Sequence, residues 1–219
     1  MENIMSAYIS LYIKGIAITF SAFIIAGTLS LAMGSIFGIL SCNYLTNQKI
    51  KMCVKGYSFI AKGIPAYVQI LIAYFILPSL LGINISAFIA ACCALAFCSS
   101  GYITEIIRSG INSVPVGQWE ACKTLGYPIK AQLKRIILPQ TFKNIGPALF
   151  GEFEQLLKST SLLAAIGISE LTRTGMNIIS RQLNPIPVYL TIACIYLLFS
   201  ALLNAVSIYI EKRLSYAQR

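Results

Sequence analysis

The chain has 219 residues, of which 57% are hydrophobic and only 11% are charged, about half the charged share of an ordinary soluble domain. So much apolar surface cannot be buried in one soluble core of this size, and the composition therefore indicates a protein that lies in a bilayer. The net charge of +10 comes from basic residues in short stretches between long apolar runs, and because no RNA-reading motif accompanies them we expect no nucleic-acid partner.

Four uncharged or nearly uncharged tracts are long enough to hold helices that cross a bilayer, which takes about 20 apolar residues for each helix. The first lies inside an uncharged run of 34 residues, Gly15 to Gln48. The next run, Gly63 to Thr104, is uncharged for 42 residues, enough for two spans that Pro78 and a turn at Gly82–Asn84 divide. The whole chain, 1–219, is thus expected to be one all-α transmembrane domain. Its five spans are expected at about 15–40, 64–82, 84–104, 145–168 and 188–210.

The lysines and arginines predict how the spans are oriented, because cytoplasmic loops carry the excess of these residues. Loops on one side hold four, six and three of them, thirteen in all, against three on the other side. This bias places the N-terminus outside and the C-terminus in the cytoplasm. The thirteen are Lys49, Lys51, Lys55, Lys62, Arg108, Lys123, Lys130, Lys134, Arg135, Lys143, Lys212, Arg213 and Arg219. The three are Lys14, Arg173 and Arg181.

The largest expected cytoplasmic segment, 105–143, is too polar to span the bilayer. Pro115 suits the first turn of a helix, and Gly126 suits the C-terminal cap of that helix. A second, basic and amphipathic piece at 129–138 suits the inner membrane surface. On pattern alone, the first helix could be an amphipathic surface helix without a partner. Three of its residues are expected on one face: Trp119, Cys122 and Leu125.

This segment resembles the EAA loop of permeases from ATP-binding-cassette (ABC) importers. The match begins with Glu120-Ala121-Cys122, which is followed after three residues by Gly126. Ile136 comes after nine more residues, and Leu138-Pro139 after one more. In its full spacing this motif is specific. Cys122 stands where the family usually has a second alanine. Four further segments are similar to the polar amino acid branch, the histidine, glutamine and arginine type. They are Lys62–Pro65 with Val68–Gln69, Gly101–Ile111, Ser113–Trp119 and Leu156–Leu162.

The resemblance covers about Gly15 to Ile210 and implies a type I (MetI-like) permease in a bacterial cytoplasmic (inner) membrane, importing a polar amino acid. It makes Pro115 to Gly126 a coupling helix that docks on a cytoplasmic ATPase dimer. ATP and magnesium belong on that ATPase, because no phosphate-binding loop occurs in this chain and the chain itself needs no cofactor. It also implies a second permease chain, identical or paralogous, and an external amino-acid-binding protein. The coupling residues are Gln118, Glu120, Ala121, Leu125 and Gly126.

The fourth span contains charged residues, which are costly in a bilayer unless they have a partner, water or a function. Glu154 and Lys158 are four apart and can pair along the helix. Glu152 has no basic residue three or four positions away, and it shares a polar stripe with Gln155 and Ser159. Such a stripe is typical of a helix face that lines a wet cavity.

In similar permeases for basic amino acids, the acidic residues that match 152 and 159 face the substrate. This chain keeps the acid at Glu152 and has Ser159 in place of the second, which makes a strongly cationic side chain less favoured. The hypothesis is that Glu152 binds the substrate ammonium group while Gln155 and Ser159 offer hydrogen bonds. Lys158 could instead meet a carboxylate if the helix turns that face inward.

Other functions fit the sequence less well. An ion-coupled carrier or channel subunit is the main alternative, but it predicts an internal repeat and acids spread over several spans, whereas here the acids cluster in one. A membrane enzyme needs a catalytic constellation, and no set of paired acids or Cys with a base stands out. A structural anchor would not need the polar stripe. With no histidine and no CxxC pair among the seven cysteines, we expect no metal site.

Overall fold

The computed structural model describes residues 2–44 and 47–216, and these are helical and connecting segments without a strand. The predicted all-α architecture is therefore confirmed. The long helices are α1 (Glu2–Leu40), α2 (Gln48–Gly63), α5 (Ala87–Asn112), α8 (Leu138–Ser159) and α10 (Pro185–Tyr216). The shorter ones are α3 (Ala66–Leu71), α4 (Leu77–Leu81), α6 (Val116–Thr124), α7 (Ile129–Gln132) and α9 (Leu171–Gln182). Two π-helical turns, Ile72–Ile76 and Leu133–Ile137, and a 3-10 segment, Thr160–Ile166, join some of them.

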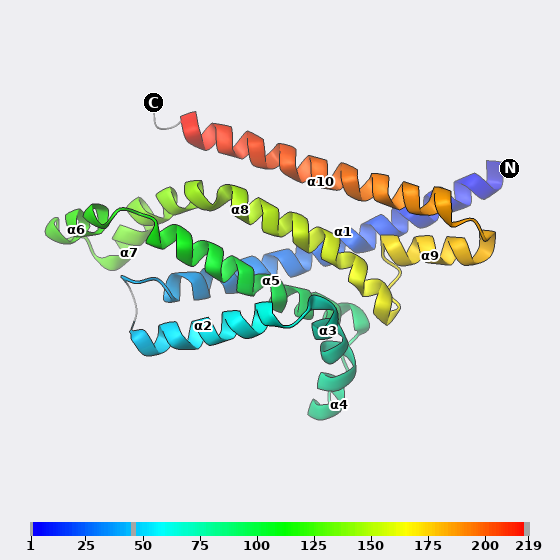
Figure 1. Ribbon diagram of the computed structural model, residues 1–219, viewed down its shortest axis with the longest axis horizontal. Coiled ribbons are helices and arrows are strands. Elements are labelled where there is room, and N and C mark those ends of the chain that lie inside the picture. Colours follow the sequence, from blue (N-terminus) through cyan, green and yellow to red (C-terminus); the bar gives the residue numbers. More distant parts are fainter. Residues whose placement is uncertain (1, 45–46, 217–219) are drawn as a thin grey trace.

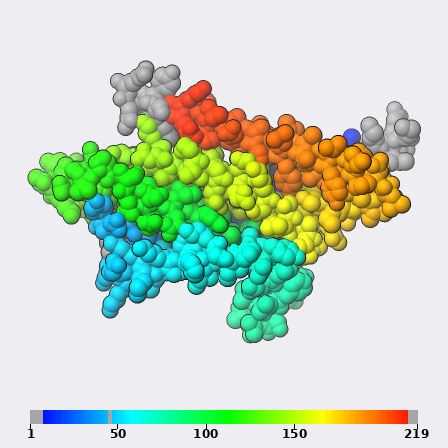
Figure 2. All heavy atoms as spheres, viewed as in Figure 1, coloured from blue at the N-terminus to red at the C-terminus, as the bar shows by residue number. Residues whose placement is uncertain are grey.

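Most long helices run side by side along the long axis of the molecule (Figure 1). Helix α5 packs against α1, α2, α3 and α8, and α10 lies on α8 and α9. Helices α6 and α7 form one end, while α9 and the N-terminal part of α1 form the other. The segment from α3 to α4 turns away and projects from the body, as the space-filling view shows (Figure 2). The bundle is thus elongated, with its two polar ends far apart.

Three helical stretches in the described residues are long and apolar enough to cross a membrane: Tyr8–Leu40, Ala87–Asn112 and Pro185–Arg213. The pair Gln48–Gly63 and Ala66–Leu81, bent by 96°, would be a fourth if it counts as one span. Helix α8 carries four charged residues and is not among these stretches. Five spans and their orientation therefore stay predictions.

The bend between α2 and α3 was not expected from the sequence. The segment of four lysines that the orientation argument treats as a loop contains α2, a helix packed on α5. The helix ends because Pro65 disfavours a helical conformation at Ile64, which is extended. The amide of Gln69 then donates to the carbonyl oxygens of Ala61 (2.8 Å) and Ile64 (2.7 Å), so the bend leaves those two acceptors satisfied.

Other boundaries follow the sequence more closely. Gly82 adopts φ +64° at the end of α4, which confirms the expected turn, although Pro78 sits inside the first turn of α4 and divides nothing. Helix α5 continues to Asn112, so the first residues of the expected loop 105–143 are helical. Before α9, the buried carboxylate of Glu170 caps the helix by accepting from the backbone N–H groups of Thr172 (2.8 Å) and Arg173 (2.7 Å). Burial raises the pKa of Glu170, and these hydrogen bonds oppose that rise.

Close packing of α1 on α5 depends on a Gly-x-x-x-Gly pair, Gly34 and Gly38. A Cβ atom added to Gly34 would lie 2.6 Å from the Cβ of Ile103, and one added to Gly38 would lie 2.7 Å from the Cβ of Ile107. Real Cβ atoms do not approach this closely. Small residues at this spacing let two helix backbones meet, which is a common way of packing helices in lipid.

We expect Gly38→Ala to destabilise the detergent-solubilised protein by about 1–3 kcal/mol, because the new methyl group overpacks the α1–α5 contact. The matched control is Gly56→Ala in α2, where a Cβ would meet nothing within 4 Å. That control should gain stability, since alanine favours a helix over glycine. Thermal unfolding midpoints measure both. Equal midpoints for the two variants would contradict the packing argument.

Candidate functional site

A cavity of about 350 Å³ opens where the α2–α3 bend meets α5 and α8. Its walls come from the end of α2 and the start of α3, one face of α5, and the second half of α8. The lining residues are Lys62, Ile64, Pro65, Ala66, Leu95, Cys98, Ser99, Tyr102, Glu152, Gln155, Leu156 and Ser159. Polar and charged groups therefore collect at one place in an otherwise apolar bundle.

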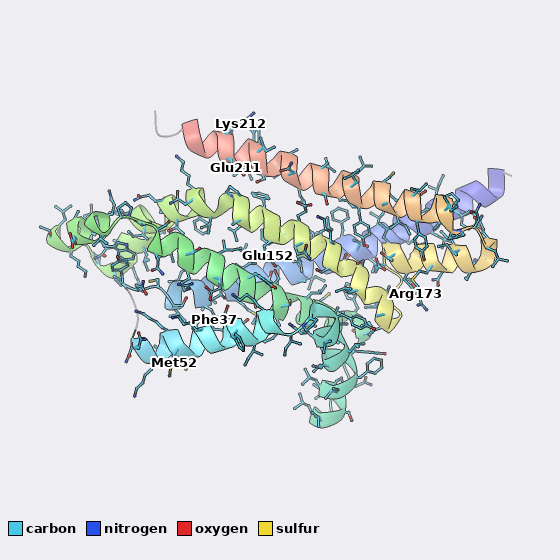
Figure 3. The ribbon with its side chains drawn as sticks, in the orientation of Figure 1. Phe37, Met52, Glu152, Arg173, Glu211 and Lys212 are labelled. Atoms are coloured by element: carbon cyan, nitrogen blue, oxygen red, sulfur yellow. The ribbon has the colours of Figure 1, made fainter. Side chains whose placement is uncertain are left out.

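Glu152 is half-buried on α8, about midway along the molecule (Figure 3). The hydroxyl of Ser99 on α5 donates to the Oε1 atom of Glu152 at 2.7 Å. No ion pair is recorded for Glu152 within 2–44 and 47–216. A carboxylate in such a place needs further donors or a cation, because burial without compensation is costly. The cavity is where such a group can be supplied.

The structure brings three of the four sequence-derived candidates to the cavity: Glu152, Gln155 and Ser159. Gln155 is exposed, and the hydroxyl of Ser159 donates to the backbone oxygen of Gln155 at 2.9 Å. Lys158 is not among the lining residues. Its Nζ atom lies 2.6 Å from Oε1 of Glu154, which confirms the expected pairing along the helix.

Sequence reasoning assigned no role to Lys62, although its segment carried part of the resemblance. Lys62 lies in the last turn of α2, and its Nζ atom sits 5.9 Å from the centre of the Tyr102 ring. It also lines a second cavity of about 370 Å³, together with Lys55, Phe59, Gly63 and Glu105. Lys62 lies just before the bend at Ile64–Pro65, and the sequence did not predict that this turn of α2 lines a cavity together with α8. The first cavity consequently has one acid, Glu152, and one base, Lys62.

Helix α6 is a short helix with well-defined ends. It starts after Pro115, and it ends in a Schellman motif in which Gly126, at φ +70°, donates to Lys123 O and Tyr127 donates to Cys122 O, both at 3.0 Å. The expected cap at Gly126 is thereby confirmed. The amide of Gln132 donates to Tyr127 O at 2.7 Å and fixes the following turn.

One face of α6 is fixed to the bundle and the other faces solvent. Trp119 is 1% exposed and stacks on Tyr44, with ring centroids 4.7 Å apart, and Cys122 is also buried. Leu125 was expected on this face, which is wrong: its side chain is 72% exposed, because the chain leaves the helix there. The five coupling candidates are all exposed: Gln118, Glu120, Ala121, Leu125 and Gly126. The outer face is therefore free for a partner.

The α6 end and the cavity are joined by the same two helices. Helix α5 leads from Ser99 in the cavity to Asn112, a distance of about 20 Å along the helix, and three residues separate Asn112 from Val116 at the start of α6. Helix α8 returns from the α7 end to Glu152. At Gly110, a Cβ atom would lie 2.1 Å from Cγ2 of Ile145, so α5 and α8 are in close contact between the two sites.

No group of three or more His, Cys, Asp or Glu residues that could hold a metal ion occurs within 2–44 and 47–216. None of the seven cysteines forms a disulfide within these residues. Cys98, half-buried, is the one that lines the cavity.

Comparison with known proteins gives consistent results. Residues 30–216 match the family model described as binding-protein-dependent transport system inner membrane component. The arginine transport system permease protein ArtQ of Bacillus subtilis (strain 168) is 32% identical over 202 residues, which are 92% of this chain and 91% of that protein. A chain from the crystal structure of an amino acid ABC transporter with histidines superposes with a TM-score of 0.84 at 34% identity, covering 95% of this chain and 96% of that chain.

A chain from inward-facing conformations of the MetNI methionine ABC transporter superposes with a TM-score of 0.82. It is 18% identical and covers 93% of this chain and 96% of that chain. At this identity the likeness concerns the fold alone. The shared fold is that of type I importer permeases, which the EAA-like motif in segment 105–143 had implied.

The two faces of α6 should respond differently to truncation. Trp119→Ala should lower the stability of the protein by about 3–5 kcal/mol, because it empties a fully buried site. Leu125→Ala should change stability by less than about 0.5 kcal/mol, because the side chain is exposed and makes little contact. Thermal unfolding in detergent measures both. A large loss for Leu125→Ala would mean that this side chain is packed after all.

Proposed function

The chain belongs to the family of binding-protein-dependent transport system inner membrane components, and from this premise we propose that the Glu152 cavity holds the substrate and that α6 receives the ATPase. The chain is the integral, non-catalytic membrane subunit of an ABC importer for polar amino acids. Its fold implies an ATPase and a substrate-binding protein as partners. The observation that carries the proposal is one acid and one base lining a single cavity in an apolar bundle.

The two charges suit the zwitterion that all amino acids share. The ammonium group of a substrate would bind the carboxylate of Glu152, which already accepts a hydrogen bond from the hydroxyl of Ser99. The carboxylate would bind Lys62. We assign it to Lys62 rather than to Lys158 because Lys62 lines the cavity and Lys158 pairs with Glu154. A volume of about 350 Å³ is at the small end of the range of about 300–1,000 Å³ for ligand pockets, which suits a small substrate.

The side chain of the substrate would face Gln155, Ser159 and Cys98, which offer hydrogen bonds and no second negative charge. A substrate with a cationic side chain would bring a positive charge that no further acid compensates. The related permease ArtQ belongs by its name to a transport system for arginine, which has a cationic side chain, whereas Glu152 is the one acid that lines the cavity of this chain. We therefore propose a polar amino acid with an uncharged side chain as the preferred substrate.

Energy for transport would come from a cytoplasmic ATPase dimer, with ATP and magnesium bound there. The exposed face of α6 would dock on this dimer through Gln118, Glu120, Ala121, Leu125 and Gly126. Its Schellman motif at the C-terminal end and the Trp119–Tyr44 stack make α6 rigid, so that a displacement by the ATPase would be passed on and not absorbed. Because α5 and α8 connect α6 to the cavity, the same displacement reaches Ser99 and Glu152.

A second permease chain, identical or paralogous, would complete the pathway in a bacterial cytoplasmic membrane. An external binding protein would deliver the amino acid to the end that holds α9. The cavity would then open in turn to each side of the membrane as the ATPase subunits close and separate.

Glu152→Gln should weaken substrate binding about 10- to 100-fold, because the ammonium group loses a charge-assisted hydrogen bond worth about 1.5–3 kcal/mol. The measurement is the stimulation of ATPase activity by a panel of polar amino acids in the complex reconstituted in vesicles, with half-saturation as the readout. Glu154→Gln is the matched control, because that acid lies off the cavity and pairs with Lys158. Unchanged half-saturation in Glu152→Gln would remove this residue from the site.

Glu120→Ala and Leu125→Ala should uncouple transport, because they alter the exposed face of α6 without emptying a buried site. We expect substrate-stimulated ATPase activity and uptake to fall at least tenfold while the protein keeps its unfolding midpoint. Lys49→Ala, an exposed lysine on the same expected side of the membrane, is the control. Full uptake by both α6 variants without ATP would instead favour an ion-coupled carrier.

A further inference from the structure

A second hollow, of about 220 Å³, lies between α1 and α9 at the end of the molecule opposite α6. Two basic side chains, Lys14 from α1 and Arg181 from the last turn of α9, line it. Its walls are apolar, from Leu11, Ile18 and Ile178, with Asn177 at the side. The combination of two cations and an apolar floor suits an anion that carries a hydrocarbon part.

The positive charges of this hollow are not neutralised by the protein within the residues that the structure describes. No ion pair is recorded there for Lys14 or Arg181, and both side chains are exposed. The acid on the neighbouring turn, Glu170, is buried and already accepts from the backbone N–H groups of Thr172 and Arg173 and from the hydroxyl of Tyr196 at 3.3 Å. A negative group that binds in this hollow would therefore come from outside the chain.

The depth of the hollow in the bilayer follows from its contacts with the expected spans. Lys14 immediately precedes the first expected span, 15–40, and lies near the start of the apolar helical stretch Tyr8–Leu40. A Cβ atom on Gly15 would lie 2.8 Å from Oγ1 of Thr174, and one on Gly175 would lie 3.2 Å from Cγ1 of Val188, where the last span begins. The middle of α9 is thus level with the ends of two spans. That level is where lipid headgroups lie.

We propose that this hollow binds the phosphate of an anionic phospholipid from the leaflet at the α9 end, with Lys14 and Arg181 on the phosphate and the apolar walls against the start of the acyl chains. Basic side chains near a membrane surface attract anionic lipids by a factor of about five each. A soluble anion would gain nothing from the walls of Leu11, Ile18 and Ile178. The proposal requires only that the chain spans the membrane, and it is independent of the substrate cavity.

The experiment uses the full chain purified with its partner subunits and titrated in detergent with phosphatidylglycerol or phosphatidylcholine, with bound lipid counted by native mass spectrometry. The wild type should retain phosphatidylglycerol in preference to phosphatidylcholine. The double variant Lys14→Gln with Arg181→Gln should lose about 25-fold in apparent affinity for phosphatidylglycerol. Arg173→Gln is the control for α9, since it removes one positive charge from that helix (Figure 3) at a residue that does not line the hollow, and it should keep the wild-type preference.

The conservative pair Lys14→Arg with Arg181→Lys should also keep the preference, which separates charge from folding. Phosphatidylglycerol bound equally by wild type and double variant would overturn the proposal, as would an equal loss in Arg173→Gln. Displacement of the lipid by millimolar inorganic phosphate would show a site for a free anion instead. If the double variant binds lipid as the wild type does but no longer docks the external binding protein, the surface belongs to that protein, and the proposal is overturned as well.

Discussion

A carboxylate in the middle of an apolar bundle is the constraint on which the cavity depends. Glu152 sits on α8 with a single hydroxyl donor, Ser99, and its charge needs more than that. The fold answers by keeping space beside it, lined by Gln155 and Ser159 on its own helix and by Lys62 on another. Where the same helix carries a second acid, Glu154, a lysine one turn away pairs with it. The two acids of α8 thus have different surroundings because only one has a local partner.

The bend at Ile64–Pro65 is the second requirement, since it forms one wall of the cavity. A proline that ends α2 would leave backbone carbonyl groups without donors in an apolar setting. The side-chain amide of Gln69 donates to two of these carbonyl oxygens. Lys62, in the last turn of α2 just before the bend, lines the same cavity. The positive and the negative group of the cavity therefore come from two different helices.

Much of this could be predicted from the sequence, and the limits have physical causes. The all-α architecture follows from apolar runs, the cap at Gly126 from a glycine in a polar loop, and the Glu154–Lys158 pair from its spacing, because each of these is local. The polar stripe on α8 is local too, and it pointed to residues that now share a cavity. Helix α2, the role of Lys62 and the exposure of Leu125 depend on contacts with distant helices or on where a chain leaves a helix, which one sequence does not show. The number of spans also remains a prediction, because α8 carries too many charged residues to be recognised as a span by hydropathy.

The glycines of α1 and α5 limit how this chain can move. Gly34 and Gly38 bring α1 onto α5, Gly101 brings α2 onto it with Ala61 at 2.7 Å from an added Cβ, and Gly110 does the same for α8. All four contacts lie in the half of the bundle nearest α6. Sliding any of these helices would separate backbones that touch, so this half behaves as a single solid block. Under the proposed function, a displacement of α6 would therefore carry this half of the chain as one rigid body, because none of its helices can slide past α5 without losing these contacts.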